Sequence, residues 1–481
     1  MEDLSSIFEP TPSYETLPIH TFYEGYPSPK KIGQGSYGTV YSLTGDILEK
    51  KSLTFNNIEE IEYSNIIETC FLASFDVPII PLLYDIKVEL DEDEDETYIV
   101  LLEKYAGQTL TKFAEGLSYK KRIEFIPILL VQMGRILVWM QDHCIAHVDI
   151  KPSNMTVNKD GTLTLIDWGF VSNVFLGSKK YHGTVSYADP KFLDYSKHPT
   201  YAYDMFGMGW SLIDFLLKSP ILSGNIITRA EYEKIRNKDD IKNLFTDISN
   251  TIGTEYVDII KKMTEYNEKD RITSIELYYH PLLISLRGEY PLIESENNTR
   301  IERVDFRKFT DVNQRMYGIL IDWLFDVSQS QEVYCPNAIL LTISILNKFL
   351  NLHPEISRKN LQAIGICCYH IATILQGKEY TFDDMEDITN NTYTRDFLYE
   401  LFMDILDELK WNVYPHDCLA DYGIDLSNKT NAEKYKNILV EISFGKPEAN
   451  TYFIYASFDD QVKILKREGL ISERFEYNFR K

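Results

Sequence analysis

The stretch IAHVDIKPSN at residues 145–154, followed by an Asp-Trp-Gly sequence that starts at Asp167, decides the fold of this 481-residue chain. It sets Asp149, Lys151, Asn154 and Asp167 at the spacing that a phosphoryl-transfer site needs. One aspartate can accept a hydroxyl proton, and a lysine two residues on can neutralise phosphate charge. An asparagine and a second aspartate can hold metal ions that bridge phosphate oxygens.

The residues between Asn154 and Asp167 predict a β-hairpin that brings these two residues together. Met-Thr-Val and Thr-Leu-Thr-Leu-Ile have strand composition, and the turn sequence Asn-Lys-Asp-Gly lies between them at 158–161. The whole pattern resembles the catalytic loop and metal-binding motif of eukaryotic protein kinases. The resemblance implies ATP and Mg²⁺ as cofactors, with Asp149 and Lys151 acting on the transferred phosphate and Asn154 and Asp167 binding the metal.

A glycine-rich stretch, IGQGSYGTVY, occupies residues 32–41 and leads into two predicted strands at 39–43 and 47–53. A strand–turn–strand context fits the kinase glycine loop and not the strand–turn–helix of dinucleotide-binding folds. Glycine lets a backbone close over phosphates because it has no Cβ in the way. The resemblance implies that the loop contacts ATP through Ile32, Gly33, Gly35, Gly38 and Val40.

The resemblance also implies a lysine that holds the α- and β-phosphates, and the sequence offers both Lys50 and Lys51. Side chains alternate between the two faces of a strand. Lys50 on the inward face puts Leu48 over the adenine and Glu49 outward. Lys51 would instead put Glu49 against the purine, which is costly without a partner. We therefore prefer Lys50 and keep Lys51 as the alternative.

This lysine needs a carboxylate partner on the following helix. Asn56 and Asn57 are residues that cap helices, so we expect the helix to start there. Glu68 lies at the family's interval before Ile80, and we expect it to pair with the lysine. The other glutamates of this helix are expected to be solvated.

Two further stretches match the kinase pattern. VLLEKYAG at residues 100–107 resembles the hinge between the kinase lobes, which implies that backbone groups of Glu103 and Tyr105 contact the adenine edge. Asp204 opens a stretch that resembles the helix anchoring the catalytic loop. Arg271 falls in a stretch that resembles the end of the lobe.

Other positions depart from that pattern. Lys191 stands where the family has a glutamate that pairs with the arginine matched by Arg271. Two cations cannot form that pair. Either Asp189 substitutes, or the stretch 183–191, which resembles the end of a kinase activation segment, is looser. The positions that receive and carry the activating phosphate in cyclin-dependent kinases match Ile67, Val148, Ser172 and Lys179. Because the phosphate-bearing threonine and the arginines that bind its phosphate are all replaced, we expect an activation segment that is ordered without phosphorylation.

The second half of the chain predicts helices. Apolar residues recur on one helical face at 316, 319, 320, 323 and 324. Asp383 and Asp384 are expected to start a short helix, and Thr394 to cap the next. The phrases MYGILIDWL at 316–324 and ILNKFL at 345–350, with the segments up to residue 413, resemble a cyclin box. A generic all-α bundle is the alternative.

Positions with defined partners in cyclins are changed here. A buried arginine–aspartate pair matches Tyr317 and Asn347, so both charges are absent together. The lysine and glutamate with which cyclins hold the regulatory helix of their kinase match Ile374 and Phe402. These two residues either make an intramolecular hydrophobic contact with the kinase domain or belong to the core of the cyclin-like domain. The stripe Met316, Ile319, Leu320 and Trp323 is likewise either a docking patch or core.

Composition limits the partners and the compartment. The net charge of −24 argues against nucleic acid as a main partner. No apolar stretch is long enough to cross a membrane, and the first residues do not resemble a signal peptide. Six scattered cysteines without a CxxC motif indicate an intracellular reducing compartment, cytoplasmic or nuclear.

The predicted fold is multidomain: a bilobal α+β protein-kinase fold followed by an all-α cyclin-like domain. We expect an N-terminal extension at 1–27, the kinase domain at 28–286, a linker at 287–303, the cyclin-like domain at 304–416 and an unassigned extension at 417–481. The whole resembles the kinase–cyclin fusion proteins of giant DNA viruses, and it implies protein substrates. Lys151 and Thr184 follow the serine/threonine pattern. The alternative is a non-catalytic regulator whose cyclin box binds and modulates another kinase.

Overall fold

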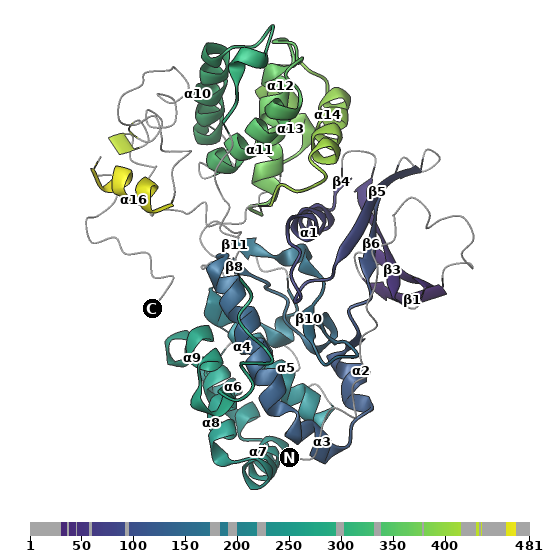
Figure 1. Cartoon of the computed structure of the whole chain (residues 1–481), viewed down its shortest axis with the longest axis vertical. Coiled ribbons are helices and arrows are strands. Elements are labelled where there is room, and N and C mark those ends of the chain that lie inside the picture. Colours follow the sequence, from purple (N-terminus) through teal and green to yellow (C-terminus); the bar gives the residue numbers. More distant parts are fainter. Residues whose placement is uncertain are drawn as a thin grey trace. The chain divides into compact units, whose positions relative to one another are not determined.

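A computed structural model of the chain describes residues 30–35, 38–44, 46–56, 60–91, 96–173, 183–190, 200–218, 228–294, 303–330, 338–377, 380–414, 430–431, 434 and 458–467. These residues form two compact units (Figure 1). The first takes the described residues of Met1–Leu53, Ile67–Asp91 and Thr97–Ser295, and the second takes those of Thr54–Ile66, Glu92–Glu96 and Glu296–Lys481. The predicted N-terminal extension, Lys179 and Lys191 lie outside the described residues.

The first unit opens with a sheet whose strand order is β1-β2-β3-β6-β5. Consecutive hairpins build its first half, because β1 pairs antiparallel with β2, and β2 with β3. The helix α1 follows this half of the sheet in the chain. The bounds of these elements are β1 Lys30–Gly35, β2 Gly38–Thr44, β3 Ile47–Asn56, α1 Tyr63–Ser74, β5 Leu83–Asp91 and β6 Glu96–Lys104.

Helix α1 begins later than the sequence predicted. Strand β3 continues to Asn56 and pairs antiparallel with the short strand β4 (Glu60–Ile61), with Phe55 opposite Ile61. The prediction that the helix starts at Asn56 or Asn57 is therefore wrong. Strand pairing decides this segment, and a capping residue is only a local preference that tertiary structure can override.

Most of the rest of the first unit is helical. The longest, α4 and α5, are buried along most of their length. Gly134 of α4 permits a close approach to α9, since a Cβ there would lie 3.0 Å from the backbone of Tyr278. The bounds are α2 Leu110–Glu115, α3 Tyr119–Glu124, α4 Ile126–Asp142, α5 Tyr201–Leu217, α6 Arg229–Arg236, α7 Asp239–Thr251, α8 Thr254–Met263 and α9 Ser274–Tyr278.

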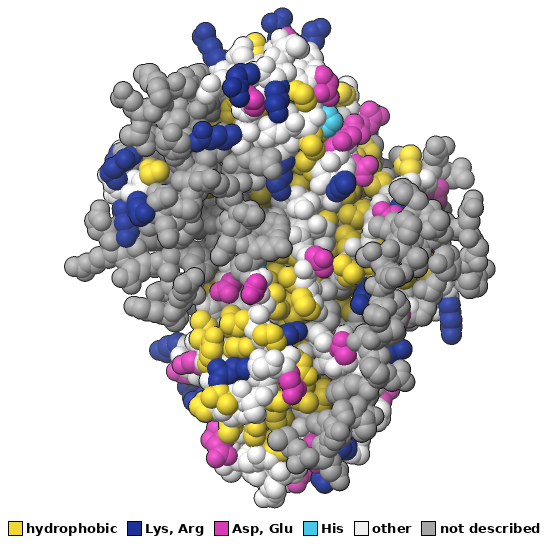
Figure 2. Space-filling model, viewed as in Figure 1, with side chains coloured by type: hydrophobic (Ala, Val, Ile, Leu, Met, Phe, Trp, Pro, Cys, Tyr) yellow, Lys and Arg dark blue, Asp and Glu magenta, His cyan; other side chains and the backbone are white. Residues whose placement is uncertain are grey.

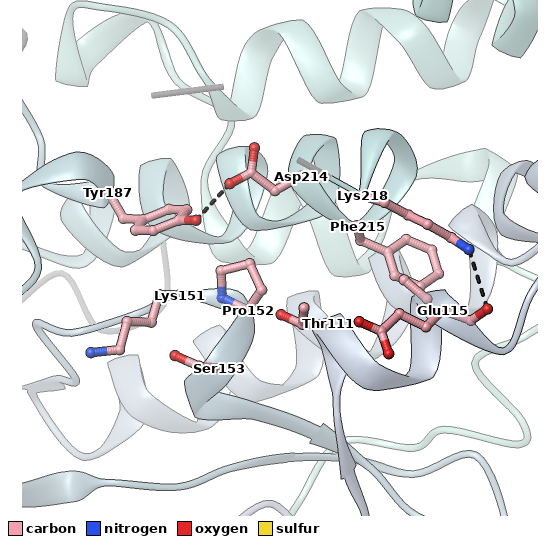
Figure 3. Close-up of a pocket in the computed structure, with 10 residues that line it drawn as sticks. Thr111, Glu115, Lys151, Pro152, Ser153, Tyr187, Asp214, Phe215 and Lys218 are labelled. Carbon is pink, nitrogen blue, oxygen red and sulfur yellow. Dashed lines mark hydrogen bonds between the residues drawn. The ribbon is translucent and has the colours of Figure 1, made fainter. Parts of the chain in front are cut away.

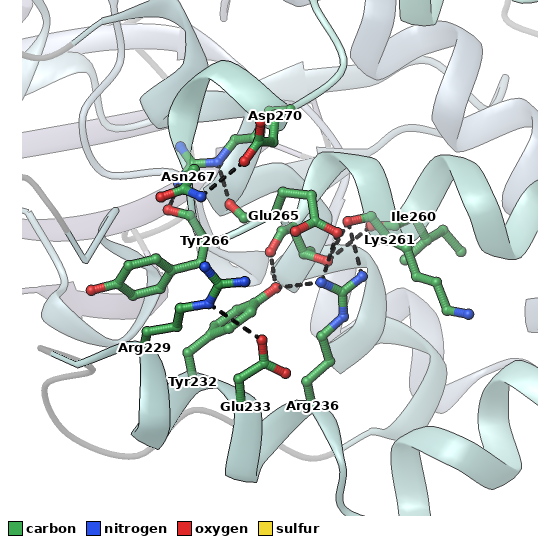
Figure 4. A network of polar contacts seen from close by, with 12 residues as sticks. Arg229, Tyr232, Glu233, Arg236, Ile260, Lys261, Glu265, Tyr266, Asn267 and Asp270 are labelled. Atoms are coloured by element: carbon green, nitrogen blue, oxygen red, sulfur yellow. Dashed lines mark hydrogen bonds and ion pairs between the residues drawn. The ribbon is translucent and has the colours of Figure 1, made fainter.

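A polar network joins α6 to the end of α8 (Figure 4). The guanidinium of Arg236 lies 2.9 Å from the carboxylate of Glu265 and also donates to the Lys261 carbonyl. The buried hydroxyl of Tyr232 donates to the carbonyl of Thr264. These contacts satisfy carbonyl groups near the C-terminal end of α8, which would otherwise lack helical partners.

Two small sheets lie between these helices. Strand β7 (Gln108–Thr109) pairs with β9 (Met155–Val157), which also pairs with β10 (Leu163–Leu165). Strand β8 (Ile145–Ala146) pairs with β11 (Ser172–Asn173). The stretch that decided the fold therefore runs from β8 through β9 and β10.

Among its described residues, the second unit is helical apart from its share of β3, β4 and β6. Its helices are α10 Gln314–Ser330, α11 Ala338–Leu352, α12 Leu361–Ile374, α13 Phe382–Ile388, α14 Arg395–Glu408 and α16 Phe458–Arg467. Helix α13 starts at the predicted place, where Thr381 and Asp384 form a capping box. Thr394 caps α14 as predicted, because its hydroxyl accepts from the Phe397 amide.

A neutral hydrogen bond occupies the position of the missing charge pair in the second unit. The Tyr317 hydroxyl of α10 donates to the Asn347 side-chain oxygen of α11 at 2.7 Å, and both residues are buried. A buried neutral pair avoids the desolvation cost of two charges. The predicted architecture, an α+β part followed by an all-α part, is confirmed among the described residues.

The apolar stripe of α10 is divided between core and surface. Leu320 is 5% exposed and packs close to α12, where a Cβ on Gly365 would lie 2.7 Å from it. Ile319 is 54% exposed, while Met316 and Trp323 are half-buried. Only part of the predicted stripe is therefore core.

The surface carries mixed charge. On the face shown in Figure 2, acidic and basic side chains of the described residues are interspersed and do not form one continuous basic surface. Among the helices that the structure describes, none is long and apolar enough to span a bilayer.

Candidate active site

The hairpin after the catalytic loop brings Asn154 and Asp167 together. Met155 of β9 pairs with Leu165 of β10, and the Ile166 amide donates to the Asn154 carbonyl at 3.0 Å. Asp167 has a left-handed backbone, with φ of 68°. Aspartate tolerates this region better than most residues, and such conformations concentrate at functional sites. The predicted hairpin is confirmed.

The carboxylate of Asp149 is the centre of a hydrogen-bond cluster. Its Oδ2 atom accepts from Lys151 Nζ at 2.6 Å and from Asn154 Nδ2 at 3.0 Å. Its Oδ1 atom accepts from the Thr184 amide at 2.6 Å. Burial alone would raise the pKa of Asp149, but Lys151 and the Thr184 hydrogen bonds lower it below its ordinary value. Asp149 is therefore ionised at neutral pH.

Lys151 also joins the activation segment to the catalytic loop. Its Nζ donates to the Thr184 hydroxyl at 2.9 Å, in addition to Asp149. The structure therefore brings together Asp149, Lys151 and Asn154, as predicted. The Thr184 amide contact with Asp149 was not predicted, since a main-chain donor leaves no signal in the residue type.

The buried Asp204 of α5 holds the catalytic loop through its carboxylate. Its two carboxylate oxygens accept from the amides of His147 at 2.7 Å and Val148 at 3.0 Å. Val148 has φ of 69°, a strained conformation for a β-branched residue. Burial raises the pKa of Asp204 to about 7, although the two amide hydrogen bonds oppose that rise. The expected anchoring role of this helix is confirmed.

Lys50 lies between two carboxylates. Its Nζ is 2.5 Å from Glu68 Oε2 of α1 and 3.6 Å from Asp167 Oδ1. Burial would lower the pKa of Lys50, but the surrounding carboxylates outweigh burial and raise it well above its ordinary value. Lys50 is therefore a fixed positive charge in this cluster.

The neighbouring lysine points to a different partner. Lys51 Nζ lies 2.8 Å from Glu89 of β5 and 4.4 Å from the centre of the Tyr98 ring. Strand alternation separates the two lysines as expected. Of the two alternatives, the structure brings Lys50 to Glu68.

The glycine-rich strands lie beside Lys50 in the sheet. Gly33 pairs with Val40, and Gly35 pairs with Gly38 at the turn between β1 and β2. Val40 pairs with Lys50 in the next hairpin. A Cβ on Gly38 would lie 2.6 Å from the Lys51 carbonyl oxygen, so this position requires glycine. Ile32 is 45% exposed at the open edge of the sheet.

The predicted adenine contact of the Tyr105 backbone stays a prediction, with its amide already engaged. The Tyr105 amide already donates to the Asp46 carbonyl at 2.8 Å, so it is not available to a purine. The side chain of Glu103, in contrast, is buried near Lys50, Glu68 and Asp167. The prediction concerned only backbone groups of Glu103, so the burial of its side chain was not predicted.

Asn154 and Asp167 fit a magnesium ion. The Asn154 Nδ2 atom donates to the carbonyl of Asp149 at 3.1 Å as well as to its carboxylate, which leaves the amide oxygen as the ligand atom. Mg²⁺ prefers oxygen ligands and is usually bound by one or two carboxylates together with substrate phosphates. Within the described ranges, no group of three histidine, cysteine, aspartate or glutamate side chains could hold a metal alone.

A pocket of about 250 Å³ opens beside Lys151 (Figure 3). The Tyr187 hydroxyl donates to Asp214 at 2.5 Å on one side, and Lys218 Nζ donates to the Glu115 carbonyl at 3.2 Å on another. The pocket thus has both acidic and basic groups next to the catalytic loop. Its lining residues are Thr111, Ala114, Glu115, Lys151, Pro152, Ser153, Tyr187, Asp214, Phe215 and Lys218.

The end of the activation segment is tied to the helical lobe through Arg271. The guanidinium of Arg271 lies 2.5 Å from the Asp189 carboxylate and also donates to the Ala202 carbonyl. Of the two alternatives for this segment, substitution by Asp189 is therefore the one observed. Ile67 and Val148, which the resemblance to cyclin-dependent kinases matches to phosphate-binding arginines, are both buried.

Comparisons with known proteins agree with this geometry. The family profile of the protein kinase domain matches residues 26–283, and that of the cyclin N-terminal domain matches residues 290–414. The probable serine/threonine-protein kinase MARK-C of Dictyostelium discoideum is 26% identical over 260 residues, which cover 52% of this chain and 32% of that protein. Protein kinase gsk3 of Schizosaccharomyces pombe is 22% identical over 302 residues, which cover 57% of this chain and 78% of that protein.

The chain therefore spans about a third of the first of these relatives. The predicted viral source and reducing compartment stay predictions. The matched kinase profile covers more than half of the chain, and the site residues lie within it. The chain belongs to the protein kinase family, and its kinase domain is fused to a cyclin N-terminal domain.

Proposed function

We propose that this chain is an ATP-dependent serine/threonine protein kinase with a tethered cyclin-like regulatory domain. The arrangement around the Asp149 carboxylate is the observation that carries the proposal. An ionised carboxylate that is oriented by Lys151, Asn154 and Thr184 can accept a proton from a hydroxyl group. Its contacts with both the catalytic loop and the activation segment support a site that is already assembled.

Each residue of this candidate active site is proposed to have its own role in phosphoryl transfer. Asp149 orients the acceptor hydroxyl and takes its proton, and Lys151 neutralises charge on the transferred phosphate. Asn154 and Asp167 hold Mg²⁺, which supplies charge neutralisation of the phosphate oxygens when bound. Lys50, fixed by Glu68, holds the α- and β-phosphates. The glycine loop of Ile32, Gly33, Gly35, Gly38 and Val40 covers them.

The acceptor is a protein serine or threonine. The Lys151–Thr184 contact at 2.9 Å supports this class, because it is the pair of residues typical of serine/threonine kinases. We propose that the acceptor segment approaches over Lys151, beside the pocket of Figure 3. The carboxylates of Glu115 and Asp214 border that approach.

Incubation of the full chain with labelled ATP, Mg²⁺ and a generic basic protein tests this function. Asp167→Ala is expected to abolish both Mg–ATP binding and transfer, because the metal ligand is lost. Asp149→Asn is expected to keep ATP binding and to reduce transfer by about 10²- to 10⁴-fold, since only proton acceptance and orientation are lost. Unchanged transfer in both variants would contradict the proposal.

The cyclin-like domain is proposed to set the position of α1 and thereby of Glu68. Within the second unit, the residues that lead into α1 pack on the cyclin-like helices. The Phe55 ring lies 5.1 Å from that of Tyr399 and 6.4 Å from that of Phe402. The Tyr63 hydroxyl donates to the Tyr380 carbonyl at 2.6 Å. These contacts support the intramolecular alternative over plain core for Phe402.

A substitution in this contact tests the regulatory role. Phe55→Ala in the full chain is expected to lower phosphoryl transfer, because α1 loses its support and Glu68 leaves Lys50. Ile319→Ala, on the exposed face of α10, is the matched control and is expected to keep transfer. Full activity of Phe55→Ala would mean that the domain serves recruitment and not activation.

One observation favours a second candidate function. The exposed Ile319, with half-buried Met316 and Trp323 beside it, supports docking of another protein on α10. In that case the chain would be a non-catalytic regulator whose cyclin box binds a separate kinase. Loss of binding to a partner kinase in Ile319→Ala, together with no transfer by the purified chain, would support this candidate.

A further inference from the structure

His370 of α12 is a buried histidine whose ring has no polar partner. The residue is fully buried, and neither ring nitrogen has a hydrogen-bond partner among the described residues. Burial lowers the pKa of His370 to about 3, and the carboxylate of Asp384 opposes this effect only in part. His370 is therefore neutral near pH 7. A buried ionisable group with two unpartnered nitrogens calls for a functional explanation.

Aromatic rings surround this imidazole. Its centre lies 5.2 Å from that of Phe382 in α13, 5.3 Å from that of Phe402 in α14 and 6.1 Å from that of Tyr380. A neutral imidazole packs in such a cluster as one more flat ring. An imidazolium needs water or an anion, because burying an unpaired charge costs far more than burying a neutral ring.

No buried charged side chain faces the imidazole among the described residues. Helices α10, α11, α13 and α14 bury only neutral side chains there, and so do α12 and the segment Thr54–Ile66. Asp384 is exposed and accepts hydrogen bonds from the Thr381 amide and hydroxyl, which cap α13. The remaining ionisable groups are phenols, which are uncharged at neutral and acidic pH. These phenols belong to Tyr369, Tyr380 and Tyr399. The cluster therefore has no buried counter-ion for a protonated His370.

The residues that cover His370 also hold the segment that leads into α1. Phe55 packs on Phe382 with ring centres 6.2 Å apart. The Tyr63 hydroxyl donates to the carbonyl of Tyr380 at 2.6 Å. Any movement of Tyr380 and Phe382 away from His370 would therefore also break these two contacts of the segment.

We propose that His370 is a pH-sensitive switch in this contact. In the closed form, Tyr380 and Phe382 cover the neutral imidazole. When His370 gains a proton, its ring has to reach water, so the two covering residues move aside and release Phe55 and Tyr63. The open form accepts the proton and the closed form excludes it, so acid favours the open form. The consequence for α1 and for catalysis rests on the proposed function of the cyclin-like domain.

The sign and the size of the effect follow from the two protonation equilibria. The pKa of His370 is about 3 in the closed form, and about 6.5 is ordinary for a histidine in water. Between these values the open form binds more protons than the closed form. The ratio of open to closed form is therefore constant above about pH 6.5 and rises about tenfold for each pH unit below it. We expect a rise of about tenfold between about pH 7.5 and about pH 5.5.

Hydrogen exchange of the full chain at these two pH values, corrected for the pH dependence of chemical exchange, measures the opening. The Met385 amide donates to the Thr381 carbonyl and reports on the first turn of α13, where Phe382 lies. The Glu62 amide donates to the Thr54 carbonyl at 2.8 Å and reports on the released segment, since a lone hairpin is only marginally stable. The opening ratio of both amides is expected to rise about tenfold, while amides of the buried helix α4 change less than about twofold. An unchanged ratio at either amide would overturn the inference.

Substitutions at position 370 test whether this histidine is the cause. His370→Phe keeps a ring in the cluster and cannot take a proton, so its opening ratio should stay within about twofold between the two pH values. His370→Asn is a smaller neutral variant, expected to behave in the same way, which covers the case that the phenylalanine does not fit. His353→Asn is the matched control, because His353 is a half-buried histidine of the same unit beside Glu355 and Glu408. It should keep the tenfold rise of the wild type.

A folded variant at position 370 that keeps the tenfold rise would also overturn the inference. Phosphoryl transfer measured at the same two pH values tests a separate claim. Opening ratios decide the role of His370, whereas absence of phosphoryl transfer at both pH values would overturn only the proposed function.

Discussion

The two ends of strand β3 carry opposite kinds of chemistry. Lys50, near its start, lies in a cluster of charges with Glu68 and Asp167 in the first unit. Phe55, near its end, lies among aromatic rings of the second unit, including those of Phe382 and Phe402. One strand therefore supplies a cation to the candidate active site and a hydrophobic anchor to the cyclin-like helices.

The difference shows how catalysis and orientation can be separated. A buried charge is useful for holding phosphates, but removing its partner leaves an uncompensated charge. Aromatic packing cannot bind phosphate, yet it fixes an element firmly through dispersion and burial. Substitutions at the charged end should therefore change chemistry first, and substitutions at the aromatic end should change stability first.

The largest effect is expected at the charged end. Lys50→Met should lower phosphoryl transfer by about 10²-fold or more, since a preorganised charge on the phosphates is lost. Lys51→Met is the matched control, because its pair with Glu89 is exposed and contributes only about 0–1 kcal/mol. Steady-state transfer rates of both variants check this prediction. Equal losses in the two would remove the distinction between the lysines.

At the aromatic end, Phe402→Ala should lower the free energy of unfolding by about 3–5 kcal/mol. The ring is fully buried, and its removal leaves a cavity. Urea-induced unfolding of the full chain measures the change. Ile319→Ala, at an exposed position, should stay within about 0.5 kcal/mol of the wild type. A similarly small change for Phe402→Ala would mean that the aromatic cluster does not anchor this unit.

At the charged end of β3, the free energy of unfolding is expected to depend on pH because of Glu103. Its pKa is about 7 in the folded chain because of burial, and about 4.3 is ordinary for an unfolded glutamate. Between these values the native state binds more protons than the unfolded state. The stability that Glu103 contributes therefore falls as the pH rises from about 4 to about 7, by up to about 4 kcal/mol, and is constant above.

Unfolding of the wild type and of Glu103→Gln across this pH range measures the effect. The wild-type stability minus that of the variant should decline with rising pH and level off near pH 7. A difference that does not depend on pH would mean that the pKa of Glu103 is the same in the folded and the unfolded chain, so that burial does not raise it. Phe402, which packs on the aromatic end of β3, does not ionise, so above about pH 7, where His370 is neutral, the stability difference between the wild type and Phe402→Ala should not depend on pH.

The smallest effect is the coupling between Phe55 and Phe402. A double-mutant cycle with alanine at both positions should give an interaction free energy of about 0.5–1.5 kcal/mol. Their rings meet edge to face at 6.4 Å, which is a favourable arrangement. Strict additivity of the two substitutions would show that each ring packs on other neighbours instead.

The sequence was most informative where local pattern and chemistry coincide. The hairpin that returns Asp167 to Asn154 follows from its turn residues, and the choice of Lys50 over Lys51 follows from strand alternation. The Thr394 cap was likewise predictable, because a capping side chain acts on its own helix. In each case the deciding contact lies close in sequence or follows from a strict period.

The sequence was least informative where distant segments compete for the same residues. The start of α1 was misplaced because strand β3 runs on to Asn56, next to a segment held in the second unit. The engaged amide of Tyr105 depends on the exact strand register, which no residue type reveals. The burial of Glu103 has the same cause. Charged side chains are mostly exposed, so the residue type gives no signal for a buried carboxyl at this position.

The second unit also constrains when the chain can fold. The hydrogen bond from Tyr63 to Tyr380 joins residues 317 positions apart. A ribosome adding about 5–20 residues per second needs roughly 15–60 s to make the residues between them. During that interval the Phe55 ring and the first turn of α1 lack their packing partners. If the cyclin-like domain sets the position of α1 as proposed, the ability to transfer phosphate should appear only after the cyclin-like helices have been synthesised.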